Sequence, residues 1–330
     1  MKILQNQDSF VTEEYREYAV PLVDVLDEKL YCKFVRDLRK NGFVCGLLLF
    51  IFSTRFDVVV SVSHRPSMVY GLLNRLFAKR GKIHIAKEFF FEVPAELSFK
   101  RRLFWMLYRF AIKHVTAIVV NSSGEVEPYA RLLNLPASRF HFIPWPTNVN
   151  TPWLVHSHDN YVFASGKSFR DWETFFAAVK GLEQKVVVVA SGADMKHRTL
   201  PSNVTLHTDI SHEQYEEILK RATVVVVPLI ETQRSTGQAS FLEAMAYGKP
   251  VVVTRVVGTV DYIEDGNNGV FYAAGNAPEL REKIELLCTD QSLREKLSSN
   301  ALRSVETRFN KRCYANAMID FAKSLLGEPR

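Results

Sequence analysis

A polar loop and the helix after it, between residues 231 and 248, carry the side chains with the clearest capacity for chemistry. The loop Glu231–Thr236 precedes a helical pattern that begins near Gly237 and that Gly248 and Pro250 end. The first N–H groups and the dipole of a helix attract anions. We therefore expect a phosphate group to bind at the start of this helix.

Glu243 adds a carboxylate to this expected phosphate site. It lies about a turn and a half into the helix, and helical side chains lean toward the N-terminus, so its carboxylate can point toward the anion. A carboxylate in that place can accept hydrogen bonds from the vicinal hydroxyls of a sugar. Phosphate and ribose together describe a nucleoside diphosphate. The alternative is a Glu beside the core that forms a cap or a salt bridge.

Two apolar runs indicate that this helix connects two strands of a parallel sheet. Thr223–Leu229 and Val251–Thr254 flank the helix, and such runs are typical of strands that are covered on both faces. In β-loop-α-β units, ligands bind at the carboxyl ends of the strands. Pro228, at the end of the first run, therefore belongs to the predicted site.

A second loop with cations, GKSFRDW, follows the expected strand Tyr161–Ser165. Its first three residues suggest a P-loop, but the Walker pattern needs a Gly five residues before its final Gly, where Tyr161 stands. This excludes a P-loop. From the residues alone, Lys167 and Arg170 are surface charges.

The segment SFLEAMAYGKPVVVT, followed by Gly258, Asp261 and EDGNNGVFY, resembles the nucleotide-sugar signature of retaining glycosyltransferases of the GT-B fold, especially family 4. The resemblance implies an α/β chain of two Rossmann-like domains that face each other across a cleft, with a C-terminal helix that crosses back to the first domain. It covers Tyr161 to Phe271 well and the N-terminal half weakly.

The expected domains follow from length and composition. A chain of 330 residues exceeds one ordinary core, and the proline-rich segment WPTNVNTPW is typical of a linker. The resemblance implies the roles of the parts: an acceptor domain over residues 1–150, a donor-binding domain over 151–308 and a returning helix over 309–330. In the first domain, Tyr18–Val25 is expected to contain a first strand, and Asp27–Phe52 is expected as a helix.

The resemblance also implies roles for individual residues. Glu243 would hold the donor ribose, and Lys167 and Arg170 match in type the two cations with which the family clamps the donor diphosphate. Ser235 occupies the position of the family's usual first glutamate. Backbone and amide donors of Thr236, Gly237 and Gln238 would replace that carboxylate. The donor-binding residues predicted are Gly166, Lys167, Arg170, Thr208, Asp209, Ile210, Pro228, Ser235, Thr236, Gly237, Gln238 and Glu243.

Two titratable residues of the first half are candidates for the reacting centre. His64 follows the expected strand Asp57–Ser61, where α/β sheets place catalytic groups, or it caps the next helix. Glu88 lies near the end of the expected strand Lys82–Phe91, beside three Phe residues. Burial there would raise its pKa and favour acid–base chemistry, or Glu88 forms a salt bridge with a nearby Lys or Arg.

The first half departs from the family elsewhere. The glycine-rich first loop, which admits the acceptor near the donor phosphates, is absent. The turn after the expected strand Thr116–Asn121 resembles a family turn that faces the cleft. Asn121 and Ser122 are therefore assigned to the acceptor side.

The segment Phe99–Val115 has the pattern of a basic amphipathic helix. Its apolar face comprises Phe99, Leu103, Met106, Leu107 and Phe110, and the cations around it are Lys100, Arg101, Arg102, Arg109 and Lys113. Such a helix can lie in a membrane interface, where each cation near lipid headgroups contributes ~1 kcal/mol. We expect membrane contact through Arg101, Arg102, Trp105 and Arg109. The alternative is a helix packed on the core with a solvated basic face.

Charge and composition restrict the partners. Residues 1–150 carry 21 Lys and Arg against 14 Asp and Glu, whereas residues 151–330 carry 21 against 22, so the first half is expected to meet something anionic. No nucleic-acid-binding motif accompanies these cations, so nucleic acid is not expected. Four cysteines without zinc spacing indicate reduced thiols, and no signal-peptide pattern opens the chain, so we expect a cytoplasmic location, peripheral on the inner face of the cell membrane.

The function expected is transfer of a sugar from a nucleotide sugar, UDP-linked in preference to GDP- or ADP-linked, to a hydroxyl of a lipid-linked or membrane-bound glycan acceptor. The retaining outcome is implied by the resemblance alone. Since no D-x-D triplet occurs, no metal and no other cofactor are expected. The sequence leaves the oligomeric state open. The alternatives are a sugar-nucleotide hydrolase or epimerase of the same fold, and a non-catalytic partner subunit.

Overall fold

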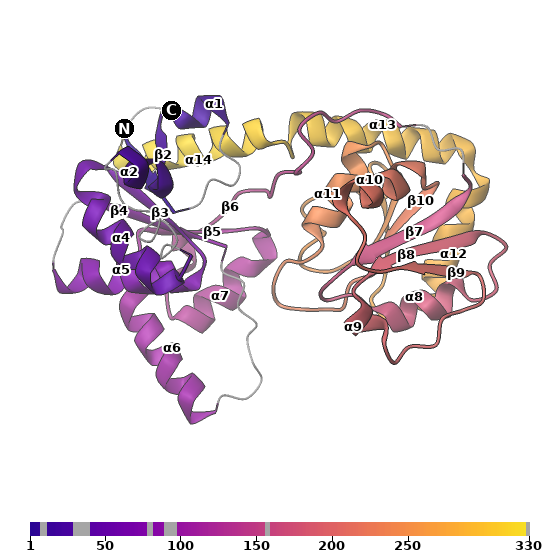
Figure 1. Cartoon of the computed structure of the whole chain (residues 1–330), viewed down its shortest axis with the longest axis horizontal. Coiled ribbons are helices and arrows are strands. Elements are labelled where there is room, and N and C mark those ends of the chain that lie inside the picture. Colours follow the sequence, from indigo (N-terminus) through magenta and orange to yellow (C-terminus); the bar gives the residue numbers. More distant parts are fainter. Residues whose placement is uncertain (7–11, 29–39, 78–81, 89–97, 156–158, 328–330) are drawn as a thin grey trace. The chain divides into compact units, whose positions relative to one another are not determined.

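The computed structural model describes residues 1–6, 12–28, 40–77, 82–88, 98–155 and 159–327, and it divides the chain into two compact units (Figure 1). Unit 1 comprises Met1–Ile143 and Lys311–Arg330. Unit 2 comprises Pro144–Asn310. Each unit contains one parallel six-stranded sheet with helices packed on it, which confirms the expected α/β fold.

The sheet of unit 1 has the strand order β2-β1-β3-β4-β5-β6. Its strands are β1 (Ile3–Gln5), β2 (Ala19–Pro21), β3 (Val58–Val62), β4 (Ile83–Lys87), β5 (Ala117–Val120) and β6 (Phe140–Phe142). Its helices are α1 (Glu13–Arg16), α2 (Leu22–Glu28), α4 (Gly42–Phe52), α5 (His64–Leu76), α6 (Phe99–Ile112), α7 (Val126–Leu133) and α14 (Lys311–Leu326).

Two expectations for the start of this unit were correct only in part. The first strand is Ile3–Gln5, and the segment expected as a strand, Tyr18–Val25, is divided between the short strand β2 and helix α2. Within Asp27–Phe52, the first two residues end α2 and Gly42–Phe52 is helical, but Lys40 and Asn41 are not, because the Asn41 side chain caps the start of α4. Residues 29–39 of this expected helix lie outside the described residues.

Helix α14 belongs to unit 1 although it is the last helix of the chain. The buried Lys87 ammonium, at the end of β4, donates to the Tyr314 hydroxyl at 3.1 Å. The Phe321 and His141 rings pack with their centroids 4.3 Å apart, and the Lys323 ammonium lies over the Tyr18 ring. The helix is thus fixed against the strands and the N-terminal segment of that unit.

The sheet of unit 2 has the strand order β12-β11-β10-β7-β8-β9. Its strands are β7 (Tyr161–Gly166), β8 (Lys185–Ala190), β9 (Val204–His207), β10 (Val224–Val227), β11 (Val251–Thr254) and β12 (Val270–Tyr272). Its helices are α8 (Trp172–Val179), α9 (Gly192–Met195), α10 (His212–Arg221), α11 (Gln238–Ala246), α12 (Ala277–Thr289) and α13 (Gln291–Thr307).

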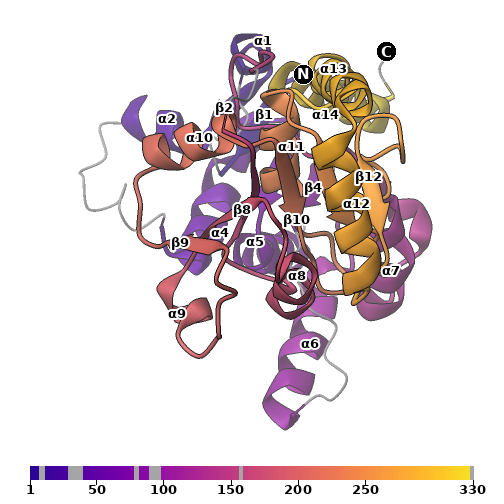
Figure 2. The ribbon, with the colours of Figure 1, turned by 90° about the vertical axis from the view of Figure 1, so that its right-hand side faces the viewer.

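Alternate side chains of the second sheet pack against helices on opposite faces. Val224 and Val226 contact α8 and α12 in one apolar cluster, whereas Phe163 points the other way and its ring lies 5.9 Å from that of Tyr215 on α10. Figure 2 shows α10 and α12 on opposite sides of this sheet. A strand with both faces covered must be apolar throughout, which explains the run Val224–Val227.

Candidate functional site

The candidate site lies where the strand order of the second sheet reverses. From β7 the chain builds outward through β8 and β9, and it then returns to add β10, β11 and β12 on the other side of β7. The loops after β7 and β10 therefore leave the same edge of the sheet side by side. Ligands of open α/β sheets bind in the crevice that such a reversal creates.

Backbone hydrogen bonds join these two loops. The Asp171 N–H donates to Pro228 O at 3.0 Å, and the Ile230 N–H donates to Phe169 O at 3.1 Å. The structure thereby brings together two groups of residues that the sequence assigned to donor binding, the group around Lys167 and the group before α11.

Arg170 is held firmly in this junction. Its guanidinium donates to Ser165 O at 2.8 Å, to Ser168 O at 2.9 Å and to Ser240 Oγ at 2.8 Å. Burial lowers its pKa to about 10, so the group stays charged at neutral pH. These three bonds leave two of its five N–H groups for a ligand, and they make Arg170 a structural tie as well as a candidate contact.

Lys167 differs from Arg170 in its surroundings. Its side chain is exposed, and no ion pair or hydrogen bond joins it to another of the described residues. It follows Gly166, whose φ of 145° requires the conformational freedom of glycine. The ammonium is therefore free to reach an anion beside the loop.

The N-terminus of α11 faces the same junction. Its N-cap is Gly237, with a φ of 88°, and no side chain among the described residues caps the helix. A Cβ added to Gly237 would lie 2.8 Å from Leu229 Cδ1, so a larger residue would strain both backbone and packing. The uncapped first turn leaves backbone N–H groups for an anion.

The residues on either side of Gly237 are buried. Ser235 and Thr236, the last residues of the loop, are buried, and Gly258 approaches so closely that a Cβ on it would be 2.5 Å from Thr236 N. The Gln238 side-chain amide donates to Gly258 O at 3.1 Å. This bond ties two loops together and uses one of the two N–H groups of the side-chain amide, while the backbone N–H of Gln238 belongs to the open helix start.

Glu243 lies on α11 with its carboxylate half-buried. The Tyr215 hydroxyl, from α10, donates to it, and Tyr215 also lies 3.3 Å from Ser165 Oγ at the end of β7. Burial raises the pKa of Glu243, and the bond from Tyr215 opposes that rise. The described structure shows no salt bridge of Glu243 with Lys or Arg, so its carboxylate is not neutralised by an ion pair.

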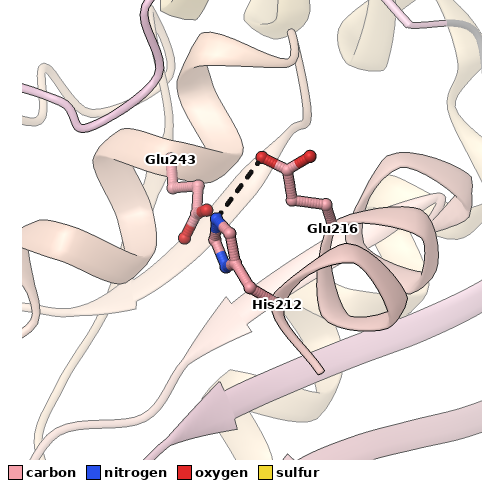
Figure 3. Close-up of side chains that lie close together, drawn as sticks. All are labelled: His212, Glu216 and Glu243. Atoms are coloured by element: carbon pink, nitrogen blue, oxygen red, sulfur yellow. Dashed lines mark ion pairs between the residues drawn. The ribbon is translucent and has the colours of Figure 1, made fainter. Parts of the chain in front are cut away.

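Two further residues of α10 stand beside Glu243, as Figure 3 shows. His212 Nε2 lies 3.6 Å from Glu216 Oε1, and one ligand atom from each of His212, Glu216 and Glu243 falls within 4.8 Å of the others. The Ser211 and Gln214 side chains form the capping box that starts α10. The spacing of Ser211 and Gln214 is a sequence signal for this helix start. Sequence reasoning missed the contact of this helix with Glu243.

Three of the residues that the sequence assigned to donor binding, Thr208, Asp209 and Ile210, lie in the loop between β9 and α10. Thr208 and Asp209 are exposed and Ile210 is half-buried, and Asp209 has a φ of 54°. The same loop leads into the helix that carries Tyr215 and His212. The loop therefore lies next to α10. Its role in binding the nucleotide base stays a prediction.

The candidates for the reacting centre lie on neighbouring strand ends of unit 1. His64 begins α5 after β3, and the Ser63 N–H donates to Lys87 O at 3.1 Å, which places this loop beside Glu88 after β4. Burial and the Arg65 cation lower the pKa of His64. Burial raises the pKa of Glu88, as expected, and Lys87, whose ammonium lies 3.7 Å from the Glu88 carboxylate, opposes the rise.

The assignment of Ser122 to the acceptor side was wrong. Ser122 is fully buried, and its hydroxyl accepts from the Gly124 N–H while Glu125 accepts from the backbone of Asn121 and Ser122. This capping box starts the turn Ser123–Glu125. Ser122 therefore holds the turn after β5 and cannot present its side chain to an acceptor.

Helix α6 has the apolar face that the sequence indicated, and most of that face is exposed. Phe99 is 82% exposed and Met106 59% exposed. Trp105, expected to insert into a membrane, is only 5% exposed and packs against Tyr108 in the core, so that expectation was wrong. Arg102 is exposed, Arg109 donates to Leu132 O at 2.8 Å, and the side chain of Arg101 lies outside the described residues.

None of the helices in the described parts of the chain has both the length and the apolar composition that a bilayer-spanning helix requires.

Family models match both halves of the chain. The model described as "Glycosyl transferase 4-like domain" matches residues 34–146, and the model described as "Glycosyl transferases group 1" matches residues 173–304. The second match includes α10, α11 and Glu243. Lys167 and Arg170 lie just before it.

Curated relatives match over short stretches. The capsular polysaccharide biosynthesis glycosyltransferase CapM of Staphylococcus aureus is 38% identical over 69 residues, which are 21% of this chain and 18% of that protein. The N,N'-diacetylbacillosaminyl-diphospho-undecaprenol alpha-1,3-N-acetylgalactosaminyltransferase of Campylobacter jejuni is 36% identical over 85 residues, 26% of this chain and 22% of that protein. The chain thus spans about a fifth of the length of these relatives.

Solved structures agree in fold along most of the chain. The Anabaena protein Alr3699/HepE, in complex with UDP and glucose, superposes with a TM-score of 0.71 at 15% identity and covers 98% of this chain and 100% of its own. Sucrose-phosphate synthase from Thermosynechococcus elongatus gives a TM-score of 0.68 at 19% identity, covering 94% of this chain and 81% of its own. At these identities the likeness shows the fold.

Proposed function

This chain belongs to the family 4-like glycosyltransferases of the GT-B fold, and we propose that it transfers a sugar from a nucleoside diphosphate sugar to a hydroxyl group. The observation that carries this proposal is the junction in unit 2. There an uncapped helix start, the exposed Lys167 and the partly buried Arg170 adjoin, and the Glu243 carboxylate lies about a turn and a half further along the helix.

The chemistry of this junction suits a departing nucleoside diphosphate. Negative charge develops on the diphosphate as the bond to the sugar breaks, and fixed cations and N–H groups stabilise that charge. Lys167, the remaining N–H groups of Arg170 and the first turn of α11 supply them. We propose that these groups make a divalent metal unnecessary for the reaction and that the anomeric configuration is retained, as in the family that the chain resembles.

UDP is the nucleotide we propose. A structural neighbour has been solved with UDP and glucose. Glu243 accepts hydrogen bonds from the ribose hydroxyls, and the loop Thr208–Ile210 adjoins the base. His64 and Glu88, on neighbouring strand ends of unit 1, are proposed to face the reacting sugar or the acceptor.

The acceptor we propose is lipid-linked or membrane-bound, in polysaccharide or glycolipid assembly on the cytoplasmic face of a membrane. The names of the two curated relatives refer to capsular polysaccharide and to a diphospho-undecaprenol. The exposed apolar face of α6, with Lys100, Arg102 and Lys113 around it, is the surface that would lie on such a membrane.

Nucleotide release tests the proposal. The full chain is incubated with UDP-, GDP- and ADP-sugars, with and without membranes, and the released nucleotide and the glycosylated product are measured. We expect UDP release that depends on membranes. Release at the same rate without an acceptor would favour a hydrolase, and failure to bind any of these donors would overturn the proposal and favour a non-catalytic subunit.

A further inference from the structure

His212, Glu216 and Glu243 form a compact group of one imidazole and two carboxylates next to the proposed ribose site. His212 and Glu216 are four residues apart on α10, so both side chains project from the same face of that helix. Glu243 approaches from α11, as Figure 3 shows. One ligand atom from each residue lies within 4.8 Å of the other two.

From this geometry we propose that the group binds a divalent transition-metal ion of the zinc class, and that the bound ion excludes the nucleotide donor. Imidazole and carboxylate are ligands that Zn²⁺ accepts at about 2.0–2.2 Å, and three protein ligands leave a position for water. An imidazole ligand favours zinc over Mg²⁺ or Ca²⁺, which prefer sites made of oxygen alone. Binding of the ion requires side-chain rotations that bring the three ligand atoms closer together than their present separations of up to 4.8 Å.

The surroundings hold Glu216 in place for this role. Tyr247 donates its hydroxyl proton to Glu216 Oε1 at 2.7 Å, and the Lys220 ammonium donates to Glu216 Oε2 at 3.0 Å. Oε1 is the oxygen that faces His212, and it keeps a second lone pair for a metal. Lys220 repels a cation, but it is bonded to the oxygen on the other side. Partners of this kind orient metal ligands.

Glu243 connects the metal to the donor. Its carboxylate has no Lys or Arg partner among the salt bridges of the described chain, and its contact is a neutral one, with the Tyr215 hydroxyl. A metal ion would satisfy this half-buried negative charge. The same carboxylate holds the ribose in the proposed function, on which this part of the inference rests. One carboxylate cannot serve both partners fully, so metal and donor compete.

Zinc titration of the metal-free full chain tests the site directly. Binding is followed by calorimetry, and Co²⁺ replaces Zn²⁺ so that its visible absorption reports the geometry. We expect one ion per chain, with affinity at least tenfold weaker in His212→Ala and in Glu216→Gln. The control is His197→Ala, an exposed histidine outside the group, which should change the affinity less than twofold. No stoichiometric binding, or equal losses in the control and in His212→Ala, would overturn the metal site.

Competition is measured with UDP. At free Zn²⁺ ten times above its Kd, the measured Kd for UDP should rise about elevenfold in the wild type by mass action. In His212→Ala, whose zinc affinity is at least tenfold weaker, the Kd for UDP should rise at most about twofold at the same zinc concentration. Zn²⁺ also binds UDP in solution, but that effect is equal in both proteins, so their difference reports the site. Zinc binding without this difference refutes the competition and leaves the metal site standing, whereas UDP binding without zinc binding refutes the metal site and leaves the proposed function standing.

Discussion

Arg170 and Ser240 are joined by a hydrogen bond of 2.8 Å from the Arg170 guanidinium to the Ser240 hydroxyl, and this bond connects the loop after β7 to the first turn of α11. The two elements that would surround a diphosphate are thus fixed to each other before any ligand arrives. A preformed site of this kind loses little entropy when it binds.

Arg170 and Lys167 form a matched pair of substitutions. Arg170→Ala should lower the free energy of unfolding by about 2 kcal/mol, because three hydrogen bonds of a partly buried charge are lost. It should also lower the rate of sugar transfer. Lys167→Ala should leave stability within about 0.5 kcal/mol and lower the rate ~10²-fold. Urea unfolding and nucleotide release measure the two effects. Loss of stability in Lys167→Ala would show that its side chain is not free.

Ser240→Ala separates the structural role of the Arg170–Ser240 hydrogen bond from the role of the Arg170 charge in donor binding. The substitution removes one partner of Arg170 and should cost about 1 kcal/mol of stability. The cation remains, so donor affinity should fall less than in Arg170→Ala. Calorimetry with UDP checks the order of the two affinities, and a larger loss in Ser240→Ala would contradict the role given to Arg170.

Glu243 is tested with a modified ligand. UDP should bind Glu243→Ala roughly ten- to hundredfold more weakly than the wild type, because hydrogen bonds to a charged acceptor contribute about 1.5–3 kcal/mol. UDP that lacks both ribose hydroxyls should bind the wild type weakly and should bind Glu243→Ala with nearly the same affinity. If removal of the hydroxyls weakens both proteins equally, the ribose assignment is wrong.

His84 should make the fold sensitive to acid. It is buried in unit 1, with Nε2 2.7 Å from Ser61 Oγ, and burial lowers its pKa to about 3. Its pKa in the unfolded chain is about 6.5, so between these values the unfolded state binds the extra proton. The stability is therefore complete above pH 6.5 and falls as the pH is lowered, by roughly 2 kcal/mol at pH 5.

The variant His84→Gln should lose this part of the pH dependence. Urea unfolding at pH 7 and pH 5 measures the slope for the wild type, for His84→Gln and for His114→Gln, whose histidine is exposed. The control should keep the wild-type slope. Equal slopes in all three proteins would mean that His84 is accessible to protons in the folded state.

The apolar face of α6 is tested by flotation with vesicles. Leu103→Ser combined with Leu107→Ser removes two exposed apolar side chains and should reduce binding to anionic vesicles severalfold without a loss of stability. The control is Leu286→Ser, an exposed leucine of α12 in unit 2. If the wild type does not float with anionic lipid, the membrane proposal fails.

The second unit was predictable because its signals are local. The run before Pro228, the helix with Glu243 and the terminators Gly248 and Pro250 follow one another in the sequence, and the comparisons confirm the fold that they indicate. The position of α10 beside Glu243 depends on tertiary packing, and no spacing in the sequence expresses it.

The sequence-based predictions that failed in unit 1 failed for physical reasons. Strands β1 and β2 contain three residues each, too few to show an alternating or apolar pattern. Trp105 lies at helical spacing with Tyr108 and Ile112, and these residues form a second apolar face of α6 that packs on the core. The arginines of α6 made this second face hard to recognise in the sequence. Ser122 could have been predicted, since Ser122 and Glu125 have the spacing of a capping box.

Helix α14 has a consequence for biosynthesis. Residues 144–310 leave the ribosome before this helix does, so unit 2 has its whole sequence available while unit 1 still lacks Tyr314 over Lys87. Domains usually fold in the order in which they are synthesised. Here the unit that is begun first is completed last, and until then its nascent sheet exposes the surface that α14 will cover.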